Sequence, residues 1–242
     1  MNRSAIPATV HDLAVRLGVK AEGNPVAVKL AQKGRIKRKI DTESWLSFTA
    51  IQSISVNECA FDWRARAGPF GMVSAHDALK NGVGQFDITA LGVIPIVRAA
   101  HSSALMRGEL IRYLAELAWA PDAIVRNGEL RWRQDPAGTI FVSAGSSETS
   151  VEVELTLDRE GRIAGAYSPD RPRSATAPFL PTPWRGRFSD FRQHQGVWIP
   201  YAGEVGWEID GKYHLYWQGR IEQWEVISET RPPSDRGVRN ET

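Results

Sequence analysis

Short runs rich in Val, Ile, Phe and Trp, each ended by a turn signal, recur along most of this sequence. After residue 127 the separators are "NGE", "DPAG", "DREG", "HQG", "IDGK" and "QG". Their spacing is close to the roughly 8–12 residues of an antiparallel meander. In "CAFDWRARA", Phe61, Trp63 and Ala65 share one face and charged side chains share the other, as in a strand covered on one side. The pattern predicts about ten or more antiparallel strands.

One long helix interrupts the strands. Apolar periodicity predicts it over residues 102–119, ending before Pro121, and predicts a short N-terminal helix over residues 6–17. Open sheets rarely exceed about ten strands without curling, and a mostly apolar helix must be covered. We therefore expect a β-rich α+β fold, in which a large curved antiparallel sheet (a half-barrel or open barrel) holds the helix on its concave face.

The chain is expected to form a single domain over residues 1–228. The tail, residues 229–242, has almost no apolar side chains and is expected to be disordered. The segment 169–184, "PDRPRSATAPFLPTPW", is rich in proline and is expected to be a long irregular loop.

Composition excludes several classes of protein. A formal net charge of +2 gives no indication of nucleic acid or an anionic membrane as a partner. Cys59 is the single cysteine, so neither an intrachain disulfide nor a cysteine-based zinc site is expected. No phosphate-binding loop, dinucleotide fingerprint or spaced histidine pair occurs, so no cofactor and no metal are expected. No secretory signal and no apolar run long enough to span a membrane is visible, which predicts a cytoplasmic protein.

A charged stripe on the central helix is the first candidate site. At 100° per residue, Glu109, Arg112 and Glu116 fall within an arc of roughly 60°, with Trp119 beside Arg112. In one interpretation the stripe is a solvated face with ion pairs between successive turns. In the other it points, flanked by Tyr113 and Trp119, into an enclosed space where it holds a polar headgroup.

Five further residues complete the candidate ligand site, each with a structural alternative. Asp77 precedes the "NGVG" turn and is equally typical of a turn cap. Arg171 lies in the proline-rich segment, where arginines are usually solvated. The aromatic side chains Trp63, Trp207 and Trp217 either pack in the core or line a ligand cavity.

Several motifs resemble an uncharacterised bacterial family of unknown function. "RYLAELAWAP" (residues 112–121), "FDWRAR" and "HDALKNGVGQF" look like the family's R-Y-L-x-E-x-x-W-x-P helix, F-x-W strand and D-x-x-x-x-G-x-G turn. "PDRPR", "PTPW" and "GVWIPYAGEVGW" look like its second half, so the resemblance covers roughly residues 25–226. It implies no established activity and hence no catalytic residues. A looser likeness is to half-barrel carriers of lipids and lipoproteins, and it warrants little about function.

Three functions remain open. The favoured one is non-catalytic binding of a hydrophobic or amphiphilic small molecule between sheet and helix, with Arg112 and Glu116 orienting its polar end. The second is a protein-interaction scaffold. The third is a hydrolase-like enzyme with Glu116 or Asp77 as general base and Arg112 as electrostatic stabiliser. The sequence does not specify the oligomeric state.

Overall fold

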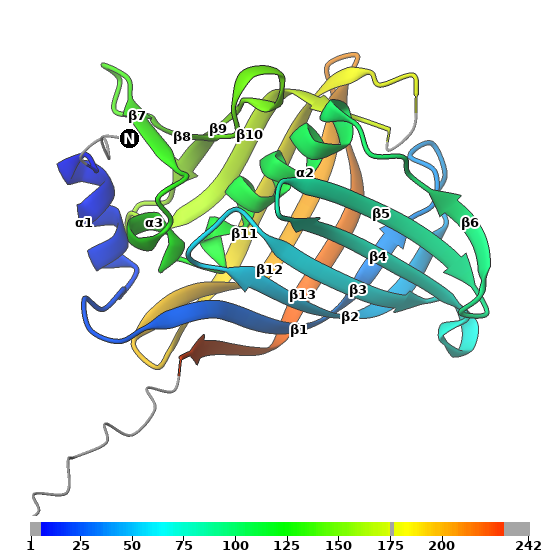
Figure 1. The fold of residues 1–242 in the computed structure, drawn as a ribbon, viewed down its shortest axis with the longest axis horizontal. Helices are drawn as coiled ribbons and strands as arrows, with labels where there is room; N and C mark the ends of the chain where they lie inside the picture. The colour runs from blue at the N-terminus through cyan, green and yellow to red at the C-terminus, as the bar shows by residue number, and fades with distance from the viewer. Residues whose placement is uncertain (1–5, 175–176, 230–242) are drawn as a thin grey trace, which may run out of the picture.

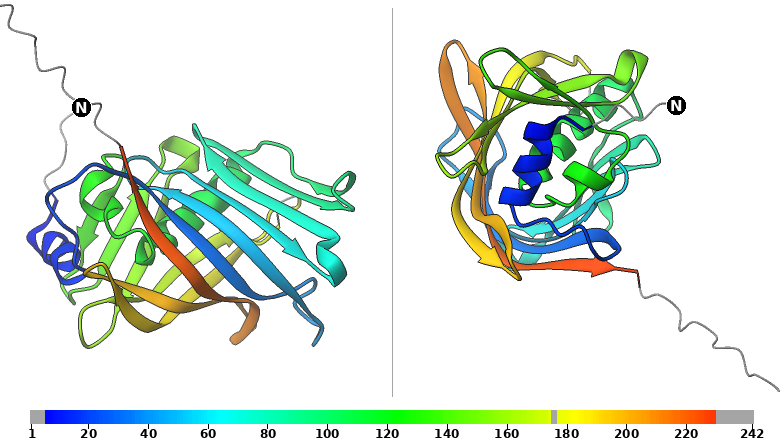
Figure 2. Two further views of the ribbon diagram at one scale, coloured as in Figure 1. Left: turned by 90° about the horizontal axis from the view of Figure 1, so that it is seen from below. Right: turned by 90° about the vertical axis from the view of Figure 1, so that its left-hand side faces the viewer.

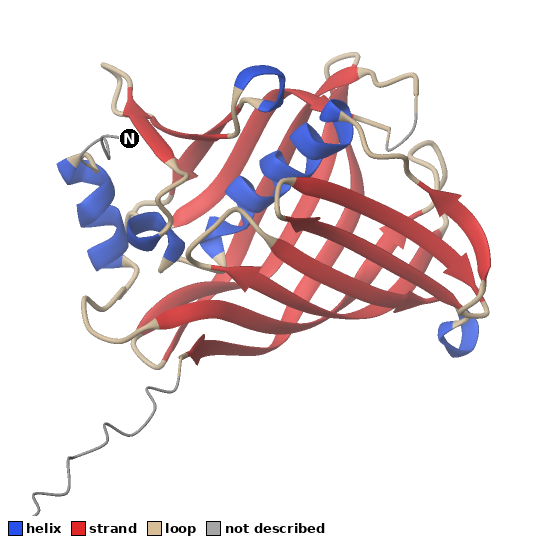
Figure 3. Ribbon diagram, viewed as in Figure 1, coloured by secondary structure: helices blue, strands red, loops and turns tan. Residues whose placement is uncertain are grey.

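The protein is one large curved antiparallel sheet with few helices. The structure, a computed structural model, describes residues 6–174 and 177–229. Thirteen strands form the sheet (Figures 1 and 3). Their bounds are β1 Pro25–Lys37, β2 Trp45–Ser55, β3 Phe61–Ala67, β4 Val73–Lys80, β5 Val83–Ala90, β6 Ile94–Arg98, β7 Arg131–Gln134, β8 Ile140–Ala144, β9 Val151–Leu157, β10 Ile163–Pro172, β11 Pro181–His194, β12 Val197–Ile209 and β13 Lys212–Ser228.

Two meanders meet in the middle of the sheet. Strands β1 to β6 follow one another outward on one side, and β13 back to β7 do so on the other. The first and last strands join the halves, with register from Pro25 opposite Ser228 to Ile36 opposite Trp217. The short strands β6 and β7 are the two edges.

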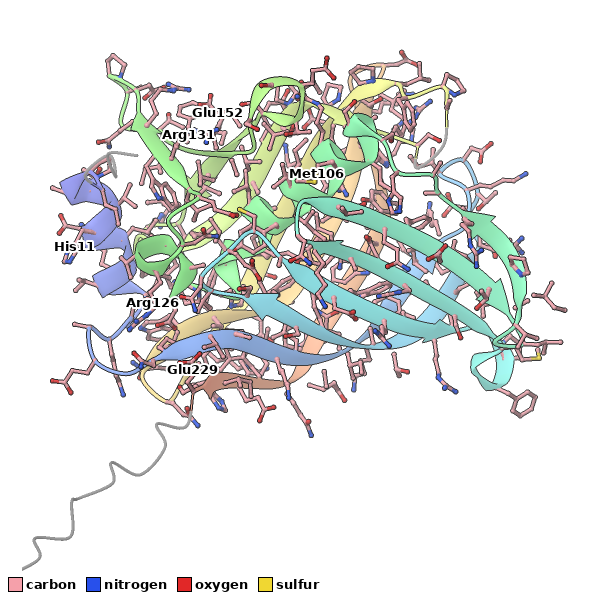
Figure 4. All side chains as sticks on the ribbon, viewed as in Figure 1. His11, Met106, Arg126, Arg131, Glu152 and Glu229 are labelled. Carbon is pink, nitrogen blue, oxygen red and sulfur yellow. The ribbon has the colours of Figure 1, made fainter. Side chains whose placement is uncertain are left out.

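The sheet curls into a half-barrel, as expected for so many strands (Figure 2). Its two halves rise on either side of helix α2, Ser103–Ala115, which lies inside the curve. The helix contacts β8, β9 and β10 of one half and β4 and β5 of the other. The side chains drawn in Figure 4 crowd the space around α2, where Met106 is labelled.

The central helix is shorter than the sequence indicates. Ser102 caps α2 by accepting a hydrogen bond from the Leu105 N–H at 3.1 Å. The α-helix ends at Ala115, and a 3-10 turn, η2 (Glu116–Ala118), follows it. Pro121 has no N–H to continue the ladder, so the last turn tightens before the chain leaves the helix. The expected span of 102–119 therefore combines two kinds of helix.

Two short helices cover one end of the half-barrel. Helix α1, Ala8–Arg16, is slightly shorter than the expected 6–17 and buries Val10, Leu13 and Ala14. It packs on α3, Ala123–Arg126 (Figure 2, right). The Trp198 N–H donates to the Leu17 carbonyl at 2.8 Å, which ties α1 to the β11–β12 turn. A side chain on Gly18, whose φ is +84°, would strike the Gly196 carbonyl, so glycine is required there.

The proline-rich segment is more regular than expected. β10 continues to Pro172, β11 begins at Pro181, and these two prolines are opposite each other in the sheet. The long loop predicted over 169–184 is therefore wrong at both ends, because prolines are tolerated where a strand begins or ends. The tail from residue 230 lies outside the described residues. In the described part of the chain, no helix is long and apolar enough to cross a membrane.

Candidate functional site

The charged stripe of the central helix is buried. Glu109 is 5% exposed and Glu116 6% exposed, and the side chain of Arg112 is 16% exposed. Glu109 and Arg112 lie on α2 and Glu116 begins η2, and Arg112 and Glu116 bind side chains on β4 and β2. Of the two interpretations of this stripe, the solvated face is therefore wrong.

Arg112 holds two carboxylates that are distant in sequence. Its Nη1 donates to Asp77 Oδ2, and its Nε donates to Glu116 Oε1 at 2.8 Å. The guanidinium also lies over the rings of Phe61 and Trp63, at 4.7 and 5.2 Å from their centroids. The cation is thus held between two anions and two aromatic faces. The alternative of Asp77 as a turn cap is wrong, because its side chain lies on the inner face of β4 and binds the helix.

A chain of amides extends the cluster across the sheet. Gln52 donates to Glu116 Oε2 at 2.5 Å, Gln32 donates to Gln52 at 3.2 Å, and Trp63 Nε1 donates to Gln32 at 3.0 Å. Gln32 and Gln52 were missed in the sequence. Gln32 continues the buried face of Val28 and Leu30 on β1, and Gln52 lies between Ala50 and Ile54 on the buried face of β2. A polar residue at such an apolar position predicts a buried hydrogen bond, and the sequence shows both.

Glu109 adds a third carboxyl group. Burial first, and then the neighbouring Asp77, raise the pKa of Glu109 well above its usual range. Burial also raises the pKa of Glu116, although Arg112 opposes it. Oδ1 of Asp77 and Oε2 of Glu109 are buried without a hydrogen-bond partner in the described residues. A proton on Glu109 allows it to donate a hydrogen bond to Asp77 and leaves two carboxylates to balance Arg112 and Arg171.

Arg171 joins the cluster from the opposite half of the sheet. Its guanidinium lies over Trp184 at 4.7 Å and over Trp207 at 5.8 Å. Trp207 stacks on Tyr216, whose hydroxyl accepts from Trp184 Nε1 at 3.1 Å. Nε of Arg171 is another buried polar atom with no hydrogen-bond partner among the described residues. The side chain is therefore not the solvated loop arginine of the structural alternative.

Trp119 and Trp217 lie together between the two halves. Their rings are 6.4 Å apart, and Trp217 also stacks on Phe48 at 5.8 Å. Phe48 in turn contacts Trp63, so the aromatic rings run continuously to Arg112. Trp119 Nε1 donates to the Pro200 carbonyl at 2.9 Å.

Tyr113 lies elsewhere. Its hydroxyl donates to the Ser55 carbonyl and accepts from Asn127, both at 2.9 Å, on the other side of the helix. The structure thus brings the other candidate ligand-site residues together and separates Tyr113 from them.

The inner face becomes more exposed from one end of the sheet to the other. Near the end covered by α1 and α3, Val28, Ile54 and Leu79 are fully buried. Towards the opposite end the inner positions of the same strands and of their neighbours are only half-buried. They are Ile36, Leu46, Val73, Phe86, Ile88, Tyr216 and Trp217. Phe86 is directly opposite Asp77, so this apolar surface begins at the charged cluster.

The clearest hollow in the described residues is away from the cluster. It measures about 480 Å³ and lies beside Lys37, Asp41, Trp45 and Tyr213, between the β1–β2 loop and the start of β13. A second hollow, about 210 Å³, lies at the covered end by Arg126 and Glu229, which Figure 4 labels. The described residues include no group of three or more His, Cys, Asp or Glu placed to hold a metal ion.

Comparisons with known proteins give a family. The family described as "Family of unknown function (DUF6544)" matches residues 2–219. No curated protein matches. Among solved structures, the crystal structure of the LolA superfamily protein NE2245 from Nitrosomonas europaea is similar, with a TM-score of 0.48 and 10% sequence identity. The match covers 93% of this chain and 96% of that one. A likeness at this level says nothing about what either protein binds.

Proposed function

The chain belongs to DUF6544, a family of unknown function, and from its own geometry we propose that it binds a hydrophobic or amphiphilic small molecule without catalysis. The ligand lies on the inner face of the curved sheet, beside α2. The observation that carries this proposal is the band of half-buried apolar side chains that begins at the buried charged cluster. Such surface is normally covered in a protein interior, and an apolar ligand would cover it.

The cluster supports an amphiphilic ligand. Buried polar atoms without partners are uncommon and need an explanation. Among the described residues, Arg171 Nε lies without a partner where the apolar inner face begins, and Asp77 Oδ1 and Glu109 Oε2 have no partner there except each other when Glu109 carries a proton. A ligand headgroup with both hydrogen-bond donors and acceptors, such as a hydroxyl or an amide, would satisfy them while its chain lies along Phe86 and Ile88.

The two other functions have less support. Both carboxylate oxygens of Glu116 are already bound, by Arg112 and by Gln52, so neither is free to accept a proton from a substrate. Asp77 is held in an ion pair with the same guanidinium. The scaffold hypothesis required the charged stripe and the basic segment 33–39 to meet a protein partner together, and the stripe is buried.

Quenching of tryptophan fluorescence by a dibrominated stearate tests ligand binding, because bromine quenches only at close range. We expect quenching that saturates with added ligand and is reduced in Trp217→Phe, while the neighbouring tryptophans account for the remainder. The control is Trp45→Phe, which removes a half-buried tryptophan from the outer face.

A second pair of variants tests the surface itself. Ile88→Asp places a charge on the half-buried inner face and should abolish binding. Ile51→Asp places the same charge on the outer face, where Ile51 is 64% exposed, and should leave binding intact. Equal binding by both variants, or no saturable quenching of the wild type, would disprove the proposal.

A further inference from the structure

Exposed apolar side chains gather at the uncovered end of the half-barrel. Phe70, in the single-turn helix η1 (Pro69–Gly71), is fully exposed, and the other members of the group range from 42% to 79% exposed. We name this group the apolar tip, and it consists of Phe70, Met72, Leu91, Val93, Ile94 and Ile96. Apolar groups of this kind on a soluble surface usually mark an interaction site.

The tip is one surface built from two neighbouring turns. The Leu91 N–H donates to the Met72 carbonyl at 2.7 Å, which joins the β5–β6 turn to the η1 turn. Figure 3 shows η1, the small helix at the lower right, beside the ends of the strands and opposite the end that α1 covers. The tip therefore projects from the end where the inner face is least buried.

Backbone conformation supports a role for this surface. Phe70 and Leu91 have φ of 54° and 53°, in the left-handed region that favours glycine and asparagine. They are the two large apolar residues among the described non-glycine residues with positive φ. A bulky side chain held in such a turn, with nothing packed on it, points to a functional constraint.

Basic side chains lie at the same end of the half-barrel as the tip. Arg66 lies against η1, since a Cβ on Gly71 would be 3.5 Å from Arg66 Cβ. Arg38 and Lys39 are exposed in the β1–β2 loop, which follows Lys37 at the same end of the sheet. Across the half-barrel the exposed residues at this end include Lys212 and Arg173. The exposed acidic residues here are Asp41, Glu43 and Asp210, so positive charge is in excess at this end. The net charge of +2 for the whole chain does not reveal this local excess.

We propose that the apolar tip docks on the surface of an anionic lipid bilayer. Phe70, Leu91 and Val93 enter the boundary between headgroups and acyl chains, and Arg66 with the other arginines and lysines at this end binds anionic headgroups. A second copy of the chain fits this surface less well. Edge strand β6 has five residues and includes Pro95, which lacks the N–H needed for pairing between sheets. Docking does not depend on the ligand proposed above.

Flotation with lipid vesicles tests the docking. The purified full chain should float with vesicles of phosphatidylcholine mixed with phosphatidylglycerol and bind pure phosphatidylcholine more weakly. Phe70→Ser combined with Val93→Ser should weaken binding about tenfold or more, because two exposed apolar groups are lost. Arg38→Gln and Lys39→Gln should each weaken binding roughly fivefold, and only to the anionic vesicles.

Matched control variants distinguish docking through the apolar tip from non-specific adsorption to vesicles. Val83→Ser changes an exposed apolar residue at the opposite end of β5, and Ile51→Ser changes one on the outer face. Both should bind as the wild type does. Equal binding by the tip variants, or no vesicle binding together with a dimer that Phe70→Ser dissociates, would overturn the proposal. The vesicle result is independent of stearate quenching, so either proposal can fail alone.

Discussion

Arg112 is the residue on which the buried cluster depends. Removing it leaves Asp77 and Glu116 buried without their cation, and breaking a buried pair in this way typically costs about 3–5 kcal/mol. We expect Arg112→Met to lower the free energy of unfolding by about that amount, measured by urea unfolding. Arg133→Met, which breaks the exposed pair with Glu152, is the control and should leave it nearly unchanged.

Glu109 should make stability depend on pH. Because its pKa is raised in the folded protein, the folded state keeps a proton that the unfolded chain loses near its ordinary pKa of about 4.3. Its contribution is therefore complete below about pH 4 and is lost as the pH rises towards the folded pKa. Glu109→Gln imitates the protonated form, so we expect it to lose less stability than the wild type between about pH 5 and pH 8.

Urea midpoints measured at several pH values check this expectation. The exposed Glu148→Gln variant is the matched control and should follow the wild type. If the urea midpoint of Glu109→Gln changes with pH as steeply as the wild-type midpoint does, this carboxyl group has the same pKa in the folded and the unfolded protein.

Part of this cluster could be predicted from the sequence. The spacing of Glu109, Arg112 and Glu116 follows from helical geometry, because residues three or four apart share a face. The partnership of Arg112 with Asp77 could not be predicted, because it depends on which strand the helix crosses. Tyr113 is adjacent to Arg112 in sequence, and its side chain leaves the helix in another direction.

At the scale of elements, one substitution in α2 should make the protein more stable. Gly108 is buried inside this helix, yet apart from its chain neighbours and the local helix backbone no atom lies within 4 Å of the place where a Cβ would be. Gly108→Ala should therefore raise the free energy of unfolding by about 0.5–1 kcal/mol, the difference in helix propensity. Thermal and urea unfolding measure the change, and a destabilised variant would contradict the open space beside α2.

The same substitution in the central pair of strands, β1 and β13, should lower the free energy of unfolding. A Cβ on Gly34 would lie 2.0 Å from the Gln218 carbonyl oxygen and 2.8 Å from the ring of Phe48. Gly34→Ala must therefore move β1 away from β13, and we expect a loss of about 1–3 kcal/mol or more, as for other overpacked sites. Unfolding measured as for Gly108→Ala gives the comparison. A neutral result would show that the two strands separate easily.

The elements themselves were more predictable than their pairing. Alternation in segments such as "FDWRARA" identified strands, and the turn signals separated them. Local patterns carry no information about β1 pairing with β13, because that contact joins residues at opposite ends of the chain. The end of α2 at Ala115 was missed because propensity does not distinguish an α-helical turn from a 3-10 turn.

At the scale of the whole molecule, the two ends of the half-barrel should differ in local stability. Amides near Val28, Ile54 and Leu79 lie beside fully buried side chains, and those near Ile36 and Leu46 lie beside half-buried ones. We expect native-state hydrogen exchange to be slower at the end covered by α1, because local opening is easier where fewer apolar contacts must break. Uniform protection along β1 and β2 would count against an open inner face.

The pairing of the first strand with the last determines when this protein can fold. During synthesis, β1 to β6 can assemble early, but the free edge of β1 stays unpaired until β13 has been made. Such long-range pairing raises contact order and slows folding. Until residue 228 leaves the ribosome, the nascent chain presents a long, apolar strand edge to its surroundings, and that interval is when it most needs protection from aggregation.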